Sequence, residues 1–164
     1  MKKEIPNHFI LTLREQSEIE QEKKNYENTR SVVVEALKIV QKYRGWVSDD
    51  AIEAIAQILN ISANDIEGIA TFYSSIFRSP VGRHIIRYCD SYVCYMNGYE
   101  KIQYLLEKIL KIKIGQTTSD KRFTLLPTSC LGYCDKSPAL MIDDNMYGPI
   151  NNYNFILVLL EQYQ

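Results

Sequence analysis

The sequence predicts an α/β protein made of a helical N-terminal bundle followed by a small α/β domain. Up to about residue 79, apolar residues recur at spacings of three and four, which is typical of amphipathic helices. Beyond Pro80 and Gly82, short β-leaning segments alternate with helical ones, the order of an open α/β sandwich. The chain's four cysteines lie in this second part, close to the ends of predicted strands. We predict a flexible arm over residues 1–11, the helical bundle over 12–79 and the α/β domain over 80–164.

Helices in the N-terminal bundle are bounded by residues that cap or stop helices. Ser31 and Ser48 are suited to accept hydrogen bonds from first-turn amides, and Gly45 and Asn60 are suited to end a helix in the left-handed conformation. The stretch Ser62-Ala63-Asn64-Asp65 fits the short form of a capping box. The expected helices cover about 12–26, 31–44, 48–59 and 62–77.

The sequence of residues 80–164 predicts strands that lead to the cysteines and helices that connect those strands. Pro138 is expected to begin the third strand in the trans form. Residues 143–145 are expected to form a turn. The expected strands are 83–88, 123–126 and 139–142, and the expected helices are 98–110 and 152–163.

The cysteines follow the pattern C-x4-C, then 35 residues, then C-x3-C. Four thiolates are the ligand set of a [2Fe–2S] cluster, with two on each iron, and the thiolate is the form that binds metal. The neighbours of the cysteines include Gly, Asp, Ser and Pro, which indicates loops rather than apolar runs. The spacing therefore predicts a cluster held by Cys89, Cys94, Cys130 and Cys134, and a protein that carries electrons.

Other uses of these cysteines fit the same spacing less well. Structural zinc remains an alternative, although the first pair is at the wide end of the usual C-x2-4-C knuckle. A thioredoxin-type dithiol would need C-x2-C, which is absent. A Rieske centre needs two histidines, and His84 would have to displace a cysteine. Gly132, inside the second pair, either brings its backbone close to a sulfur atom or is an ordinary turn glycine.

The net charge and the hydropathy of the chain limit which partners and which cellular location are expected. The net charge is −1, so neither nucleic acid nor an anionic membrane surface is an expected partner. No run of 18 apolar residues exists, which predicts no membrane span. The first thirty residues contain no apolar signal region and several glutamates, unlike secretory or organellar leaders. We expect a cytoplasmic, reducing location.

Several longer motifs resemble one known family. They are Gly45-Trp46-Val47, the stretch from Asp65 to Tyr73, Pro80-Val81-Gly82-Arg83-His84 leading into Cys89, and the stretch from Cys130 to Pro138. From about residue 12 to the last residue, the chain resembles the 24-kDa-subunit family of respiratory complex I, known in bacteria as the E subunit of NADH-quinone oxidoreductase. This resemblance implies a thioredoxin-like [2Fe–2S] ferredoxin domain behind a helical region, with Cys89, Cys94, Cys130 and Cys134 at the four ligand positions.

The same resemblance implies the partners and the reaction. The family member docks beside the flavoprotein subunit that binds NADH and FMN, within the peripheral arm of a proton-translocating NADH:quinone oxidoreductase. Its cluster exchanges electrons with that FMN, so no hydride chemistry is expected here, and the chain contains no G-x-G-x-x-G motif. The implied location is peripheral, on the cytoplasmic side of the inner membrane. Similar subunits occur in NAD-linked hydrogenases and formate dehydrogenases, which remain an alternative assembly.

Overall fold

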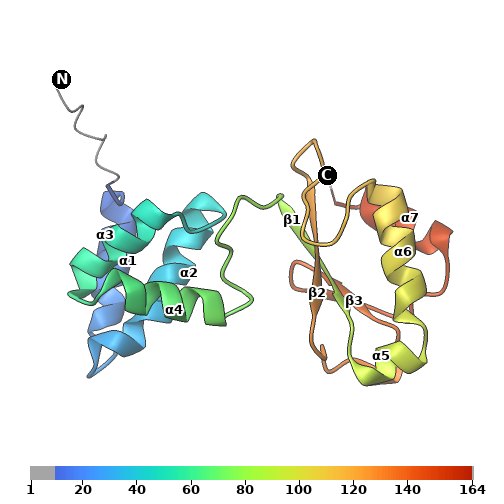
Figure 1. Cartoon of the computed structure of the whole chain (residues 1–164), viewed down its shortest axis with the longest axis horizontal. Coiled ribbons are helices and arrows are strands. Elements are labelled where there is room, and N and C mark those ends of the chain that lie inside the picture. Colours follow the sequence, from blue (N-terminus) through green and yellow to red (C-terminus); the bar gives the residue numbers. More distant parts are fainter. Residues whose placement is uncertain (1–9, 164) are drawn as a thin grey trace. The chain divides into compact units, whose positions relative to one another are not determined.

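The structure is a computed structural model that describes residues 10–163. Contacts within the chain divide it into two compact units, and the boundary lies between Pro80 and Val81. The unit before this point is helical, and the unit after it contains the sheet (Figure 1). Most of the arm predicted over residues 1–11 lies outside the described residues. Leu11, the last residue of that arm, is buried in the core of the helical unit, so it does not belong to a free arm.

The helical unit packs the apolar stripes of its helices into one core. Each helix contributes residues spaced three and four apart, including Ala36, Leu37 and Val40 from the second α-helix and Ile52, Ile55 and Leu59 from the third. The helices are α1 (Leu13–Lys23), the 3-10 helix η1 (Thr29–Val32), α2 (Val33–Arg44), α3 (Asp49–Leu59) and α4 (Ala63–Phe72).

Three of the predicted helix limits are confirmed. The Ser48 hydroxyl accepts a hydrogen bond from the Ala51 N–H at 3.2 Å and caps α3. Gly45 (φ 81°) ends α2 and Asn60 (φ 53°) ends α3, both in the left-handed conformation that stops a helix.

Other predicted limits are wrong. Ser31 lies inside η1, which is capped instead by the Asn28 side chain. Helix α4 begins directly after Ser62, as predicted, although the Ser62 side chain makes no capping bond; the helix ends at Phe72 instead of continuing toward Phe77. Contacts with α2 explain the early end, because Gln41 Oε1 accepts from the Phe77 N–H and Gln41 Nε2 donates to the Ser75 carbonyl at 2.8 Å. The Phe77 N–H thus bonds to a side chain instead of to the Tyr73 carbonyl, which would be its partner in a helix that continued to Phe77.

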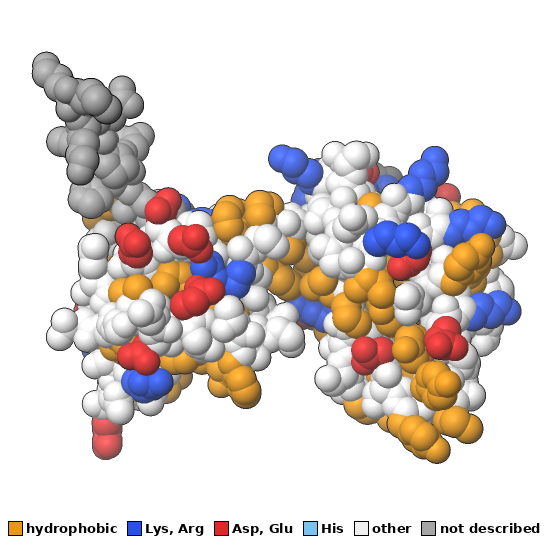
Figure 2. Space-filling model, viewed as in Figure 1, with side chains coloured by type: hydrophobic (Ala, Val, Ile, Leu, Met, Phe, Trp, Pro, Cys, Tyr) orange, Lys and Arg blue, Asp and Glu red, His pale blue; other side chains and the backbone are white. Residues whose placement is uncertain are grey.

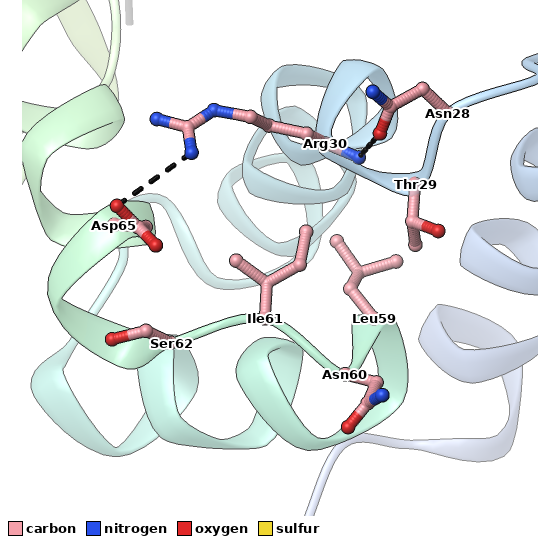
Figure 3. Close-up of a pocket in the computed structure, with 8 residues that line it drawn as sticks. All are labelled: Asn28, Thr29, Arg30, Leu59, Asn60, Ile61, Ser62 and Asp65. Carbon is pink, nitrogen blue, oxygen red and sulfur yellow. Dashed lines mark hydrogen bonds and ion pairs between the residues drawn. The ribbon is translucent and has the colours of Figure 1, made fainter.

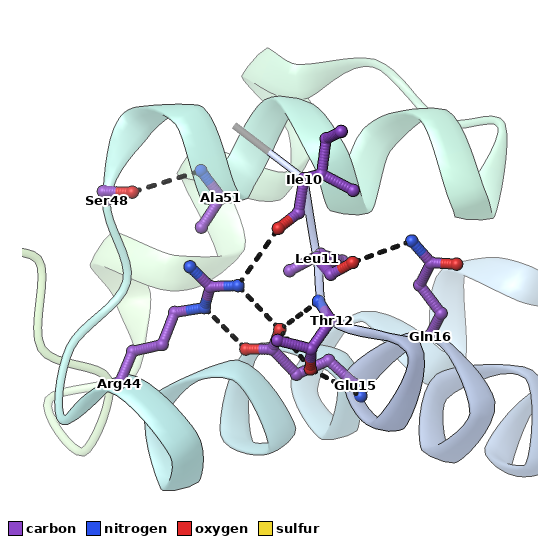
Figure 4. Close-up of polar contacts among 8 residues, drawn as sticks. All are labelled: Ile10, Leu11, Thr12, Glu15, Gln16, Arg44, Ser48 and Ala51. Carbon is purple, nitrogen blue, oxygen red and sulfur yellow. Dashed lines mark hydrogen bonds and ion pairs between the residues drawn. The ribbon is translucent and has the colours of Figure 1, made fainter. Parts of the chain in front are cut away.

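An ion pair between the half-buried Arg44 and the buried Glu15 joins the first two α-helices (Figure 4). Arg44 Nε lies 2.6 Å from Glu15 Oε1, and Arg44 Nη2 lies 2.6 Å from Glu15 Oε2, so the two groups meet as a two-pronged pair. Thr12 and Glu15 also form a complete capping box at the start of α1. Burial raises the pKa of Glu15, but hydrogen bonds from Arg44 and Thr12 outweigh it, and the net pKa is lowered.

The second unit is built on a mixed four-stranded sheet of order β2-β1-β3-β4. The central strand β1 runs parallel to β2 and antiparallel to β3. The strands are β1 (His84–Cys89), β2 (Phe123–Thr128), β3 (Leu140–Ile142) and β4 (Asn145–Tyr147), and the helices are α5 (Tyr92–Met96), α6 (Tyr99–Leu110), the 3-10 helix η2 (Cys134–Lys136) and α7 (Tyr153–Glu161).

Helices α6 and α7 cover one face of this sheet (Figure 1). Ile102 and Leu106 of α6 and Ile156 of α7 pack against inward-facing strand residues such as Ile86 and Leu125. The strand residues in this core lie two apart, Ile86 and Tyr88 on β1 and Phe123 and Leu125 on β2, so they share one face of the sheet. The core thereby holds the ends of β1 and β2 in a fixed position.

Three features of this unit differ from the predictions. The turn predicted at residues 143–145 is confirmed at Asp143 (φ 53°) and Asp144, but strand β4, which begins at Asn145 and completes a hairpin with β3, was not predicted. Helix α5 was not predicted, because five residues are too few to show a helical period. Pro138 was expected in the trans form at the start of a strand, but it follows a cis peptide bond and β3 begins at Leu140.

Candidate metal-cluster site

The register of the two parallel strands brings both cysteine segments to one edge of the sheet. Cys89, the last residue of β1, lies opposite Thr128, the last residue of β2. The Asp90 N–H donates to the Thr128 carbonyl at 3.0 Å, which continues the pairing one residue further. Because Cys130 comes two residues after Thr128, the second cysteine pair starts beside the first.

The first pair is buried under this edge. Cys89 and Cys94 are each 2% exposed and form a small apolar cluster with Ala139, against which Leu131 and Tyr133 pack. The backbone of Ala139 bonds to both cysteines, since its carbonyl accepts from the Cys89 N–H at 3.0 Å and its amide hydrogen-bonds to Cys94. The prediction of loop surroundings is wrong for this pair, because Cys89 ends a strand and Cys94 lies in α5.

The second pair is exposed and closely spaced. Cys130 Sγ lies 3.5 Å from Cys134 Sγ, and both side chains reach solvent. Gly132, between them, has φ 75° and donates its N–H to Cys130 Sγ at 3.4 Å. The structure therefore supports the interpretation of Gly132 as a residue whose backbone approaches a sulfur atom.

Electrostatic interactions connect all four thiols. Burial, together with the neighbouring Cys89 and Cys134 thiols, raises the pKa of Cys94 to about 11 and outweighs the lowering effect of the Ala139 backbone. The Gly132 amide, followed by the Cys134 thiol and the Ser91 and Cys89 side chains, lowers the pKa of Cys130. The hydrogen bond with Cys130 raises the pKa of Cys134, and the charges of Cys89 and Asp135 act in the same direction. Each segment thus lies within electrostatic range of the other.

The donor set fits a [2Fe–2S] cluster in number and type. Such a cluster takes four cysteine thiolates, two on each of its irons. Here two cysteine pairs from separate segments meet at one edge of the sheet, and backbone amides already point at Cys130 and Cys94. Among residues 10–163, no three or more His, Cys, Asp or Glu side chains converge on a single point where one metal ion could bind.

The tyrosines near the cysteines have different roles. Tyr88 is 3% exposed and stacks on Tyr99 with ring centroids 5.9 Å apart, so it packs in the core. Tyr92, Tyr95 and Met96 are exposed on α5. Figure 2 shows hydrophobic side chains gathered at the end of the second unit where α5 lies. An apolar surface therefore adjoins the cysteines.

Lys136 lies beside the cysteine site, whereas His84 does not. Lys136 Nζ donates to the Tyr133 hydroxyl at 2.9 Å and lies 5.0 Å from the ring centroid of Tyr133. His84 begins the strand that Cys89 ends, and its Nδ1 lies 2.7 Å from Asp143 Oδ2. His84 therefore belongs to the opposite end of β1, and His8 lies outside the described residues.

A separate hollow of about 450 Å³ lies in the helical unit (Figure 3). Arg30 Nη1 and Asp65 Oδ1 face each other there at 3.7 Å, and the Asn28 side chain accepts from the Arg30 N–H. No cysteine lines this hollow, so it is not part of the cysteine site. Within residues 10–163, no helix is both long enough and apolar enough to cross a bilayer.

Comparison with known proteins finds one family model and relatives that share one name. The family model of the thioredoxin-like [2Fe–2S] ferredoxins matches residues 19–164. The E subunit of NADH-quinone oxidoreductase from Buchnera aphidicola subsp. Acyrthosiphon pisum is 59% identical over 161 residues, covering 98% of this chain and 99% of that protein. The E subunit from Escherichia coli strain K12 is also 59% identical, covering 95% of this chain and 93% of that protein.

Solved structures give the same fold. A NAD+-reducing [NiFe]-hydrogenase in the H2-reduced state matches with a TM-score of 0.66 and 25% identity over 78% of this chain. The same enzyme type in the air-oxidised state matches with a TM-score of 0.61 and 26% identity over 70% of this chain. This chain spans only 20–22% of those longer hydrogenase chains. From the family model and the near full-length relatives, the chain belongs to the thioredoxin-like [2Fe–2S] ferredoxin family, in the group of NADH-quinone oxidoreductase E subunits.

Proposed function

We propose that Cys89, Cys94, Cys130 and Cys134 hold one [2Fe–2S] cluster, through which this chain transfers electrons as a subunit of NADH:quinone oxidoreductase. The observation that carries the proposal is the β1–β2 register, which sets Cys89 opposite Thr128 and so brings two distant cysteine pairs to one edge. When bound, such a cluster supplies one-electron oxidation and reduction.

The chain's own residues bind the cluster and set the electrical environment of its ligands. Burial of Cys89 and Cys94 keeps water from one side of the site, and exposure of Cys130 and Cys134 leaves the other side open to a partner. The amide of Gly132 donates to Cys130, and the amide of Ala139 hydrogen-bonds to Cys94. Hydrogen bonds to ligand sulfurs stabilise negative charge and raise the reduction potential.

The partner in this proposal is the flavoprotein subunit that holds FMN and binds NADH, together with other subunits of the peripheral arm. Hydride transfer would take place on that flavoprotein, and this chain would exchange single electrons with its FMN. The names of the relatives and the NAD+-reducing activity in the hydrogenase names support this assignment. The exposed α5 side chains beside the cysteines offer a surface for contact. The proposed location is the cytoplasmic side of the inner membrane.

Iron and sulfide analysis tests the cluster. Anaerobically purified protein should contain two irons and two acid-labile sulfides per chain, in line with a [2Fe–2S] composition. It should be brown and give an EPR signal on reduction. Colourless protein with zinc and no labile sulfide would instead identify a zinc-stapled interaction module.

Matched variants test the ligands. Cys130→Ala should abolish the cluster or greatly reduce its content, because one iron would lose a ligand. Tyr133→Phe changes a neighbour inside the same loop and keeps every thiol, so its iron content should stay near that of the wild type. A normal cluster in the Cys130 variant would disprove the ligand assignment.

The hydrogenase likeness favours one alternative assembly, a soluble NAD-linked hydrogenase. Affinity capture of the tagged chain from a whole-cell lysate treated with mild detergent, which keeps both soluble and membrane complexes, separates the two assemblies. Recovery of quinone-reducing subunits supports the proposal, and recovery of hydrogenase subunits overturns it while leaving the cluster in place.

A further inference from the structure

A side-chain hydrogen bond joins the two cysteine segments without using a cysteine. Asn97, which caps the C-terminal end of α5, donates from Nδ2 to Ser137 Oγ at 2.8 Å. Asn97 follows Cys94 by three residues, and Ser137 follows Cys134 by three residues. The bond therefore connects the helix that carries one proposed ligand to the loop that carries another.

The same amide group also closes its own helix. Asn97 Nδ2 donates to the Val93 carbonyl at 2.9 Å, in the last turn of α5. A side-chain amide nitrogen has two N–H donors, so one can serve Val93 and the other Ser137. Because both N–H donors are used, the side chain of Asn97 is held in one orientation even though it is exposed to solvent.

The other end of helix α5 also lies near the second cysteine loop. Ser91 occupies the N-cap position of α5 but makes no side-chain bond to its own helix. Its side chain instead helps to lower the pKa of Cys130, so the hydroxyl lies near that sulfur atom. Serine at this position usually caps the helix, as Ser48 does for α3, so the hydroxyl has been directed to the other segment.

We infer that Asn97 is a positioning residue for the cluster, because its bond to Ser137 holds the Cys130–Cys134 loop against the helix that carries Cys94. This inference rests on the proposed function. Cluster ligands supplied by two segments stay in place only while both segments keep their relative position, and residues outside the ligand set maintain that position. The bond thereby slows the opening of the loop through which iron is lost.

The test is a double-mutant cycle on the cluster-loaded full chain, with iron transfer to a chelator as the measured rate. Asn97→Ala and Ser137→Ala should each release iron about fivefold faster, which corresponds to about 1 kcal/mol at 1.4 kcal/mol per tenfold change. The double variant should release iron no faster than either single variant, because both remove the same bond. Ser137→Thr keeps the hydroxyl and should release iron at the wild-type rate.

EPR spectra of the reduced protein give a second measurement that a purely structural role would not move. The g values should shift in Asn97→Ala and Ser137→Ala and stay unchanged in Ser137→Thr. Asn64→Ala, at an exposed asparagine on α4 of the other unit, is the control and should match the wild type in both measurements.

The outcomes separate this inference from the proposed function. Additive effects in the double variant, or release rates and g values equal to those of the wild type, would overturn the role of Asn97 while the cluster itself stands. Wild-type protein without iron and labile sulfide would overturn the proposed function first.

Discussion

The backbone N–H of Gly132 lies 3.4 Å from the sulfur of Cys130 and donates a hydrogen bond to it. The bond depends on a backbone at φ 75°, which glycine adopts at little cost and other residues adopt with strain. One glycine thus places a donor on a proposed ligand and lowers the pKa of that ligand.

Gly132→Ala should lower the reduction potential of the cluster. A Cβ at this position would meet no atom within 4 Å, so the substitution acts through backbone strain alone. If the loop relaxes and the bond of about 1 kcal/mol is lost, the potential should fall by about 40 mV for a one-electron couple. Gly115→Ala is the matched control, because Gly115 has φ 80° and the same open space. Spectroelectrochemical titration should show an unchanged potential for the control, and equal potentials for both variants would contradict the prediction.

The apoprotein thiols should react with iodoacetamide in a defined order. Only the thiolate reacts, so a thiol labels as the pH rises toward its pKa. The exposed Cys130 has a lowered pKa and should label at lower pH than an ordinary thiol. Cys94 is buried with a pKa of about 11, so it should remain protonated and unlabelled through about pH 9. Peptide mass spectrometry measures each site, and urea-unfolded protein should lose the difference. Labelling of Cys94 before Cys130 in folded protein would refute this order.

Arg44→Met should destabilise the helical unit in a pH-dependent way. The variant leaves the Glu15 carboxylate buried without its main partner, and should lower the free energy of unfolding by about 2 kcal/mol at pH 7. The pKa of Glu15 is lowered in the folded state, so the pair contributes fully above the unfolded pKa and its contribution is lost as the pH falls through the folded pKa. The difference between variant and wild type should therefore shrink at pH 3.

Urea unfolding followed by fluorescence checks this expectation, because Trp46 is the only tryptophan and lies in the helical unit. Lys38→Met serves as the control, since it removes an exposed pair with Glu35 at 2.9 Å and should cost less than about 0.5 kcal/mol. A loss of equal size at pH 3 and pH 7 would show that packing of the arginine stem, not the ion pair, explains the effect.

Gly148→Ala should displace the second cysteine loop. A Cβ at Gly148 would overlap the carbonyl oxygen of Lys136, so one of the two backbones must move. Lys136 follows Cys134 by two residues, and we expect reduced iron content and a stability loss of about 1–3 kcal/mol. Gly68→Ala in α4 is the control, because its Cβ would meet no atom within 4 Å. Iron content per chain measures the effect, and full cluster loading in Gly148→Ala would show that the loop tolerates the shift.

Local chemistry explains why several features are predictable from the chain alone. Ser48, Gly45 and Asn60 mark helix limits through their own side chains or backbone preferences, so they act without distant partners. The cysteine spacing likewise predicts the type of site, because thiolate number and type are properties of the residues themselves. The flanking motifs then identify the family.

Contacts between distant segments explain the features that the chain alone does not predict. Helix α4 stops at Phe72 because Gln41, far away in the sequence, bonds to the backbone around Phe77. Cys94 is buried in a helix because α5 folds against Ala139, and Cys130 comes near Cys89 because β1 pairs with β2 in one particular register.

The kind of metal site and the limits of several helices therefore follow from residue types and their spacing, since those properties are local. The way in which the two cysteine pairs meet follows from the folded unit instead. Strand register, and side-chain bonds such as that of Asn97 with Ser137, depend on the packing of residues that lie far apart in the chain.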